Sequence, residues 1–182
     1  LAVPGQVLPV CTQNAALEAT FADGSRVVGE TAITSAKKDK NLDIRSIRLL
    51  PEDTQALPQA LQAIREAELI VLGPGSLYTS IIPNLLVGGV AESLRQSPAL
   101  KLYVLNVMTQ DGETEHYSAA DHARAILKHQ GCIDVCLYNT QEIPDKLAAR
   151  YMPEGSEPLR PVPEEFRRLG IRLFGGDMLS RN

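Results

Sequence analysis

Cysteine and long apolar runs are scarce in this sequence. Three cysteines, Cys11, Cys132 and Cys136, form an odd and sparse set, which predicts free thiols in a reducing compartment and not a disulfide framework. Because Cys132 and Cys136 have no second cysteine pair to complete a zinc site, we interpret them as core residues. No apolar segment reaches the ~18 unbroken residues of a membrane span. We therefore expect a cytoplasmic protein with no membrane span and no metal site.

An excess of basic charge is also lacking. Eighteen Lys and Arg residues against 22 Asp and Glu residues leave a net charge of −4, whereas nucleic-acid binding needs a concentrated basic surface. The densest basic run, Lys37, Lys38 and Lys40 around Asp39, is interpreted as a solvated loop. Nucleic acid is therefore not an expected partner.

The start of the sequence has neither the initiating Met nor the charged and apolar regions of a signal peptide. We expect the chain to be the later portion of a longer domain. Its 182 residues are enough for one well-buried core and hardly enough for two. A single α/β domain over residues 1–182 is therefore expected, with a β-rich hairpin region at 5–50 and a βαβ region at 51–182.

The hairpin region alternates apolar and polar residues with the period of two that is typical of strands. Asp23-Gly24 supplies a turn between two such stretches, so an antiparallel hairpin is predicted. A polar connection is expected from Lys37 to Asp43. Strands are expected at 6–11, at 17–21, from 26 onward, and at 44–50, where Pro51 ends the last one.

The region from residue 51 alternates helical patterns with continuous apolar runs. The apolar runs are typical of strands buried on both faces, and they lie at 69–72, 102–107 and 133–138, with a last candidate strand at 171–174. Helices are expected at 57–68, 76–97, 118–130 and 144–151, and a proline-rich loop at 153–163. Within 76–97 a break is expected at Pro83 and a softer stretch at Gly88-Gly89. This alternation predicts βαβ units and a mainly parallel sheet in which the first three strands are adjacent.

The strongest local signal of a ligand site is the run Gly-Pro-Gly-Ser-Leu-Tyr-Thr-Ser at 73–80. It follows a strand and opens a helix, which points free backbone N–H groups at one spot suited to a phosphate. Gly75 permits close approach of a ligand, and Ser76 and Thr79 add hydroxyl donors. The run matches neither a dinucleotide fingerprint, a Walker loop nor a nucleophile elbow. A capped turn without a ligand is an equally supported alternative. The candidate ligand-binding residues of this run are Gly73, Pro74, Gly75, Ser76, Tyr78 and Thr79.

A second polar segment, Asn106–Gln110, leaves the end of the next predicted strand. The carboxyl ends of parallel strands meet at one edge of a sheet, so this segment and the run at 73–79 are expected to line one crevice. Asn106, Thr109 and Gln110 suit hydrogen bonds to sugar hydroxyls or base edges. The alternative is a polar turn built on Asp111-Gly112.

A third segment opens the predicted helix at 118–130. Ser118 and Asp121 resemble a capping box, and that structural role alone would explain Asp121. His122 is expected to begin the exposed part of the helix. Because His129 lies two turns further on, the two histidines do not form a metal pair without other ligands.

These stretches together resemble the YvcK-like, or gluconeogenesis factor, branch of the CofD-like family. The similarity is carried by the run at 69–86, by Asn106–Gln110 with Gly112-Glu113-Thr114, and by Ala120-Asp121-His122, while residues 4–10 and the hairpin fit the same family. The resemblance implies a Rossmann-like fold and a protein that binds UDP-sugars and is linked to cell shape, cell-wall precursor supply and gluconeogenic growth. The family's Gly-Gly-Gly-Thr-Gly loop, Asp-Asn-Gly-Gly stretch and His-Gly-Asn region are absent from this sequence. A second copy or a partner chain is expected to cover the missing part.

Three functions follow from this reading. The preferred one is a UDP-sugar-binding regulatory protein, with Asp121 and His122 among its ligand-binding residues. The first alternative is a CofD-type phospho-lactyl transferase with a nucleotide-activated donor, which would need carboxylates to hold Mg²⁺ near phosphates. The second is a scaffold without a ligand site. Only Asp111, Glu113 and Asp121 lie near the inferred site, and each has a structural explanation. No catalytic residue, metal ligand or certain cofactor is therefore assigned.

Overall fold

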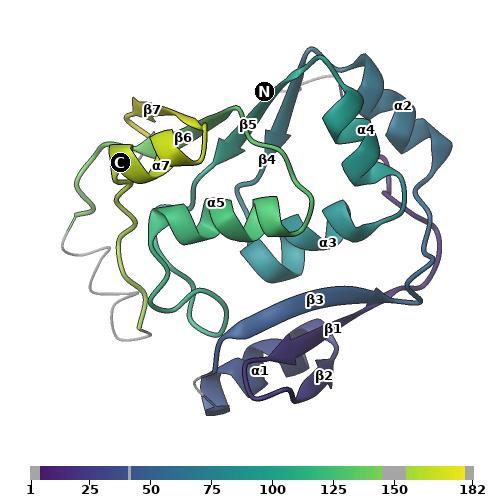
Figure 1. Cartoon of the computed structure of the whole chain (residues 1–182), viewed down its shortest axis with the longest axis horizontal. Coiled ribbons are helices and arrows are strands. Elements are labelled where there is room, and N and C mark those ends of the chain that lie inside the picture. Colours follow the sequence, from purple (N-terminus) through teal and green to yellow (C-terminus); the bar gives the residue numbers. More distant parts are fainter. Residues whose placement is uncertain (1–4, 41, 145–154, 179–182) are drawn as a thin grey trace.

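The computed structural model describes residues 5–40, 42–144 and 155–178. Two sheets lie on either side of a group of helices, which include α3 (Ile82–Leu86) and α5 (Ala119–Lys128) (Figure 1). The upper sheet in that view is parallel and has four strands. The lower one is antiparallel and has three.

The parallel sheet confirms the α/β fold class. Its strands are β4 (Leu69–Leu72), β5 (Leu100–Val104), β6 (Val135–Asn139) and β7 (Arg172–Gly176), and they pair in that order. The three expected strands are therefore adjacent, and the fourth candidate is confirmed as well. One expectation was wrong, because β4 is an edge strand of the described sheet, with Leu69 51% and Val71 48% exposed.

One face of the parallel sheet is open to solvent. The register pairs Leu69 with Leu100 and Leu137 with Phe174, so these side chains share a face with Val71. On this face Leu100 is 40% and Phe174 65% exposed. The opposite face is part of the core, where Tyr103 and Cys136 are buried together with residues of α5 and of α4 (Val90–Gln96). The core of the described chain therefore lies on one side of this sheet.

The antiparallel sheet confirms the predicted hairpin. Strand β1 (Ala16–Phe21) pairs with β2 (Arg26–Val28) and with β3 (Ile44–Leu50). Gly24 in the turn has φ +82°, a conformation that glycine adopts without a steric penalty. Glu18, on the more polar face of β1, accepts a hydrogen bond of 2.6 Å from Arg48, which holds the pKa of its carboxyl below the ordinary value.

Two expectations in this region were wrong. The segment expected as a polar connection is the end of helix α1 (Glu30–Lys40), whose Ile33 and Lys37 are both buried. Lys37 behaves there as a long apolar stem with a paired ammonium group, a role that its charge does not suggest in the sequence. Residues 6–11 form no strand, because no other strand pairs with them. That segment is held to the fold by a hydrogen bond of 2.8 Å from Leu57 N–H to Val10 O.

The remaining helices largely follow the predicted pattern. Helix α2 (Pro58–Glu66) begins at its proline as expected. The long helix expected at 76–97 is divided into a π-helical turn η1 (Leu77–Ile81), α3 and α4. Gly88-Gly89, where the helix was expected to be soft, separates α3 from α4. The break expected at Pro83 was wrong, because η1 and α3 follow one another without interruption. Pro83 lies in the first turn of α3, where its missing N–H costs little.

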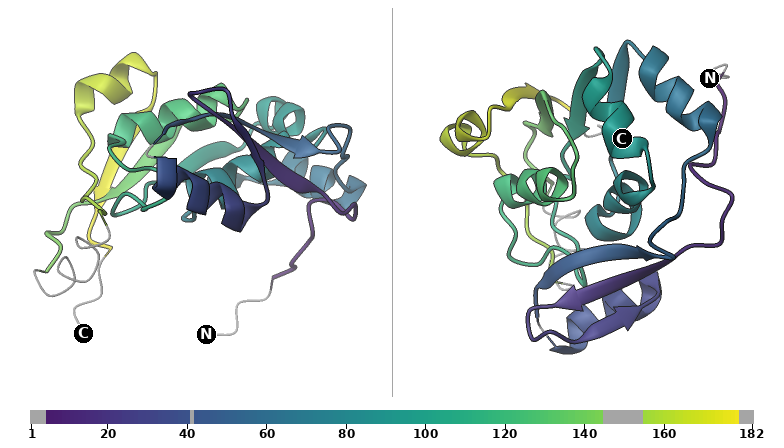
Figure 2. Two further views of the ribbon diagram at one scale, coloured as in Figure 1. Left: turned by 90° about the horizontal axis from the view of Figure 1, so that it is seen from below. Right: turned by 45° about the vertical axis from the view of Figure 1, so that its right-hand side comes forward.

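Helix α7 (Pro163–Arg168) was not expected, although its Pro and two Glu residues are typical of a helix start. It follows the described part of the proline-rich loop, residues 155–162, which has no helix or strand. Figure 2 shows α7 beside α5. The helix expected at 144–151 lies outside the described residues, apart from Pro144. Within the described ranges, none of the helices has both the length and the apolar character needed to cross a membrane.

Candidate functional site

The glycine-rich turn leaves β4 and enters η1 as the sequence predicts. Gly73 has φ +83°, so the residue that needs a left-handed backbone is Gly73 and not Gly75. The backbone N–H groups of Gly75 and Ser76 have no hydrogen-bond partner in the part of the chain that the structure describes. Both residues are only partly buried. The turn therefore offers two N–H donors at the start of a helix.

The second polar segment lies directly against this turn. Ser76 Oγ donates to Gln110 Oε1 at 2.8 Å, and Asn106 Nδ2 donates to Gly75 O at 3.1 Å. The two segments therefore meet at the carboxyl ends of β4 and β5, as expected. Thr109 does not take part, because its hydroxyl accepts the N–H of Glu157 at 2.7 Å on the other side of the segment.

Glu113 fastens the second segment to the start of η1. Its Oε2 accepts the backbone N–H of Tyr78 at 3.0 Å and its Oε1 accepts the hydroxyl of Thr79. The side chain is 1% exposed, and this burial raises the pKa of its carboxyl, although the bonds from Thr79 and Tyr78 act in the opposite direction. From the sequence, Glu113 was weighed as a magnesium ligand and assigned a structural role without a named partner. Its role as an anchor depends on a contact 35 residues away in the chain, which local patterns do not show.

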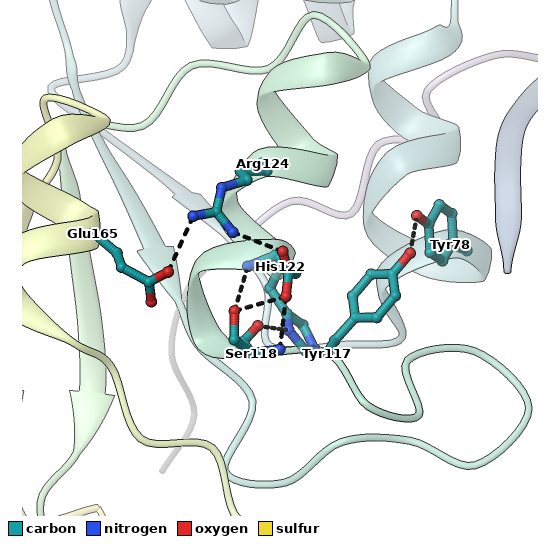
Figure 3. Close-up of polar contacts among 7 residues, drawn as sticks. Tyr78, Tyr117, Ser118, His122, Arg124 and Glu165 are labelled. Atoms are coloured by element: carbon teal, nitrogen blue, oxygen red, sulfur yellow. Dashed lines mark hydrogen bonds and ion pairs between the residues drawn. The ribbon is translucent and has the colours of Figure 1, made fainter.

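An aromatic cluster joins η1 to α5, and Figure 3 shows its members Tyr78, Tyr117 and His122. The hydroxyls of Tyr78 and Tyr117 are 2.8 Å apart, and each tyrosine makes an edge-on ring contact with a histidine. Burial raises the pKa of Tyr78, so its hydroxyl stays neutral. The candidate Tyr78 is therefore a packing residue whose backbone and hydroxyl are both bonded within the protein.

Two histidines are buried in this cluster, His122 within α5 and His129 at its carboxyl-terminal cap. His122 is 0% exposed, so the expectation that it begins an exposed stretch was wrong. Its Nδ1 lies 3.1 Å from Ser118 O, and the Nδ1 of His129 lies 2.7 Å from Ala125 O. These carbonyls accept, so each Nδ1 carries the proton. Each Nε2 is then an acceptor, and neither has a partner among the described residues. Burial lowers the pKa of both histidines.

Asp121 has the structural role that its sequence position suggests. Ser118 Oγ accepts the N–H of Asp121, while Asp121 Oδ2 accepts the N–H of Ser118 at 2.9 Å, which completes the predicted capping box. Arg124 then bridges Asp121 of this cap and Glu165 of α7 at 2.7 and 3.2 Å (Figure 3). Although burial acts to raise it, these bonds hold the pKa of Asp121 below its ordinary value. Its contacts therefore join two helices and do not reach the glycine-rich turn.

A cleft of about 350 Å³ lies between α1 and the two loops. Thr79, Gln110 and Glu113 line one wall, and Thr31, Thr34, Ser35, Lys38 and Glu30 of α1 line the other. This wall was not predicted, because a strand was expected from residue 26 onward and a solvated loop at residues 37–40, where the structure has α1. Within the described ranges, no group of three His, Cys, Asp or Glu residues is placed to hold a metal ion.

Comparison with known proteins places these features in a family. The sequence model of 2-phospho-L-lactate transferase CofD matches residues 1–179. The gluconeogenesis factor of Bacillus subtilis is 43% identical over 182 residues, which cover 99% of this chain and 56% of that protein. The gluconeogenesis factor of Halalkalibacterium halodurans is 43% identical over 173 residues, which cover 94% and 52% respectively.

Solved structures show the same relationship. A crystal structure of a Bacillus halodurans protein matches with a TM-score of 0.92 at 40% identity, over 98% of this chain and 57% of that chain. The chain thus spans about half the length of the relatives that it matches.

Proposed function

Since the chain belongs to the CofD family and to its gluconeogenesis factor branch, we propose that it contributes to a UDP-sugar site in a cytoplasmic regulatory protein. The regulated processes in this proposal are cell shape, cell-wall precursor supply and growth on gluconeogenic carbon. The proposed small-molecule partner is a nucleotide sugar. The proposed protein partner, a second copy or another chain, would cover the open face of the parallel sheet.

The observation that supports this proposal most is the pair of unpartnered N–H groups at Gly75 and Ser76. They lie at the start of η1 and α3, which run continuously from residue 77 to 86. The positive end of that helix already binds one anion, the carboxylate of Glu113 at the Tyr78 N–H. A phosphate at the two remaining N–H groups would use the same attraction. Asn106 and Gln110 hold the turn in this shape.

The name of the matched family favours a second candidate, a transferase of the CofD type. Such a reaction would need carboxylates that are free to hold Mg²⁺. In this chain Asp111 is paired with Lys38 at 2.6 Å, Glu113 with the start of η1, and Asp121 with its helix cap. These three carboxylates thus have protein partners, which weighs toward binding. Formation of a phospho-lactyl product by this chain, followed by mass spectrometry, would favour the transferase.

Calorimetric titration with UDP-N-acetylglucosamine tests the proposal on this chain and on the Bacillus subtilis relative. We expect the Gly75→Val variant to bind about tenfold to a hundredfold more weakly, because a branched side chain obstructs the N–H groups. The fold should survive, since a Cβ at Gly75 would meet Ser80 Cβ at an ordinary 3.4 Å. Unchanged affinity in a folded variant would show that the turn is only a helix cap. If neither protein binds the ligand, the scaffold alternative is favoured.

A further inference from the structure

The cleft between α1 and the loops has one wall made by a polar stripe of that helix. Thr31, Ser35 and Lys38 are spaced four and three residues apart, so they lie on one face of α1. The hydroxyls of Thr31 and Ser35 are exposed and have no hydrogen-bond partner within the described ranges. Ile33 and Lys37 lie on the buried side of the helix. The polar stripe therefore lies outside the core and faces the cleft.

The opposite wall combines donors and acceptors from the carboxyl ends of two strands. Thr79 follows β4, and Gln110 and Glu113 follow β5. The Thr79 hydroxyl and the Gln110 amide thus face the hydroxyls of α1, while the Glu113 carboxylate behind them is occupied by Tyr78 and Thr79. The cleft volume of about 350 Å³ lies within the ~300–1,000 Å³ typical of small-molecule sites. None of the residues that line this cleft is aromatic. Such a lining suits a polyhydroxylated ring, which needs both donors and acceptors, better than a base, which stacks on aromatic side chains.

The cleft begins where the glycine-rich turn ends. Gln110, which lines the cleft, accepts the hydroxyl of Ser76 at 2.8 Å, so one hydrogen bond joins the turn to the wall of the cleft. A phosphate held at the turn would therefore have this cleft next to it.

The two walls are fixed to one another before any ligand binds. Gly112 has φ +82°, and a Cβ at this position would overlap the methyl group of Thr34, so the loop lies directly on α1. Buried Lys37 also pairs with Glu115 of the same loop at 3.3 Å. A preformed cleft spares the ligand the cost of ordering the walls.

We infer that this cleft is the sugar subsite, in which Thr31 and Ser35 of α1 bind hydroxyls of the hexosyl group while its phosphate lies at the glycine-rich turn. This assignment rests on the proposed function. It adds that α1, which belongs to the same layer as the antiparallel sheet, determines whether the protein binds a UDP-sugar more tightly than UDP.

Titration of this protein with UDP-N-acetylglucosamine and with UDP tests the assignment. In the double variant Thr31→Val/Ser35→Ala the dissociation constant for the UDP-sugar should rise about fivefold to fiftyfold, because two hydrogen bonds are lost. The dissociation constant for UDP should change less than twofold, a margin within about 0.4 kcal/mol. Ser46→Ala, an exposed hydroxyl of β3, is the matched control and should change neither. Circular dichroism confirms folding.

This experiment distinguishes a wrong subsite assignment from a wrong proposed function. If the wild type binds both ligands and the double variant weakens both equally or neither, the subsite assignment is wrong and the proposed function stands. If the wild type binds neither UDP-sugar nor UDP, the proposed function is wrong and the subsite with it.

Discussion

The carboxylate of Glu113 accepts the backbone N–H of Tyr78 at 3.0 Å. This contact joins the loop after β5 to the helix that follows the glycine-rich turn. It satisfies one of the N–H groups that every helix start leaves without an intrahelical partner. The turn is thereby held in place from its far side, while the N–H groups of Gly75 and Ser76 remain without partners in the described structure.

Replacing Glu113 with Ala should lower the free energy of unfolding by about 2–4 kcal/mol. The variant leaves the Tyr78 N–H and the Thr79 hydroxyl without their acceptor in a buried place, at a cost of about 1–3 kcal/mol each. Glu92→Ala, which removes an exposed pair with Arg95, should change the free energy by less than about 0.5 kcal/mol. Urea unfolding measures both variants. An equal loss in the two would contradict the anchoring role of Glu113.

Two glycines of the turn should respond differently to Ala. Gly73 has φ +83°, and a Cβ there would lie 3.2 Å from Val104 O and from Ile81 Cδ1, so Gly73→Ala should lose about 1–3 kcal/mol of stability. Gly75 lacks this constraint, and Gly75→Ala should stay within about 1 kcal/mol of the wild type. The midpoints of thermal unfolding of Gly73→Ala and Gly75→Ala measure this difference in stability. Similar midpoints for both variants would mean that the turn tolerates a side chain at either position.

Neighbouring lysines of α1 offer a second matched pair. Lys37 is 2% exposed and pairs with Glu115 at 3.3 Å, so Lys37→Met leaves a largely buried carboxylate without its cation. We expect a loss of about 3 kcal/mol or more in the free energy of unfolding. Lys38→Met breaks the more exposed pair with Asp111 and should cost less than about 1 kcal/mol. Urea unfolding in which Lys37→Met is as stable as Lys38→Met would argue against a structural role for the buried pair.

Stability should fall when the pH drops below the ordinary histidine pKa of about 6.5. Burial lowers the pKa of His122 and His129 in the folded protein, so the unfolded chain takes up protons there that the folded chain does not. The stability is therefore complete above about pH 6.5 and is lost below it, with a slope approaching about 1.4 kcal/mol per pH unit for each histidine. The raised pKa of Glu113 acts with the opposite sign. Its contribution is complete below its ordinary pKa and is lost as the pH rises through the folded one.

Urea unfolding at pH 7.5, 6.5 and 5.5 measures this slope. The variant His122→Phe should flatten it by about one proton, whatever its effect on stability at pH 7.5. A slope that His122→Phe does not change would assign the acid sensitivity to other groups.

Sequence patterns predicted those elements whose formation depends on neighbouring residues. The four parallel strands, the Asp23-Gly24 turn and the Ser118 cap were predictable because each depends on residues within a few positions. The burial of β4 was not, since an apolar run does not tell how many neighbours a strand has. Helix α1 was missed because Lys37 counts as polar in a sequence, although its ammonium group is paired inside the fold.

The candidate site shows the same division. The meeting of the turn with Asn106 and Gln110 followed from strand order alone. Both the anchoring by Glu113 and the burial of His122 depend on how distant elements pack, which short-range patterns do not encode. Whether the candidate residues bind a ligand stays a prediction.

The open face of the parallel sheet should make this chain associate more readily as the temperature rises. This face exposes large apolar side chains, with which water forms no hydrogen bonds: Leu69, Val71, Leu100 and Phe174. Attraction between such surfaces is driven by the release of that water and weakens on cooling. Solutions of the chain should therefore keep best in the cold, and should become turbid first when warmed in a salt such as sulfate, which strengthens the burial of apolar surface.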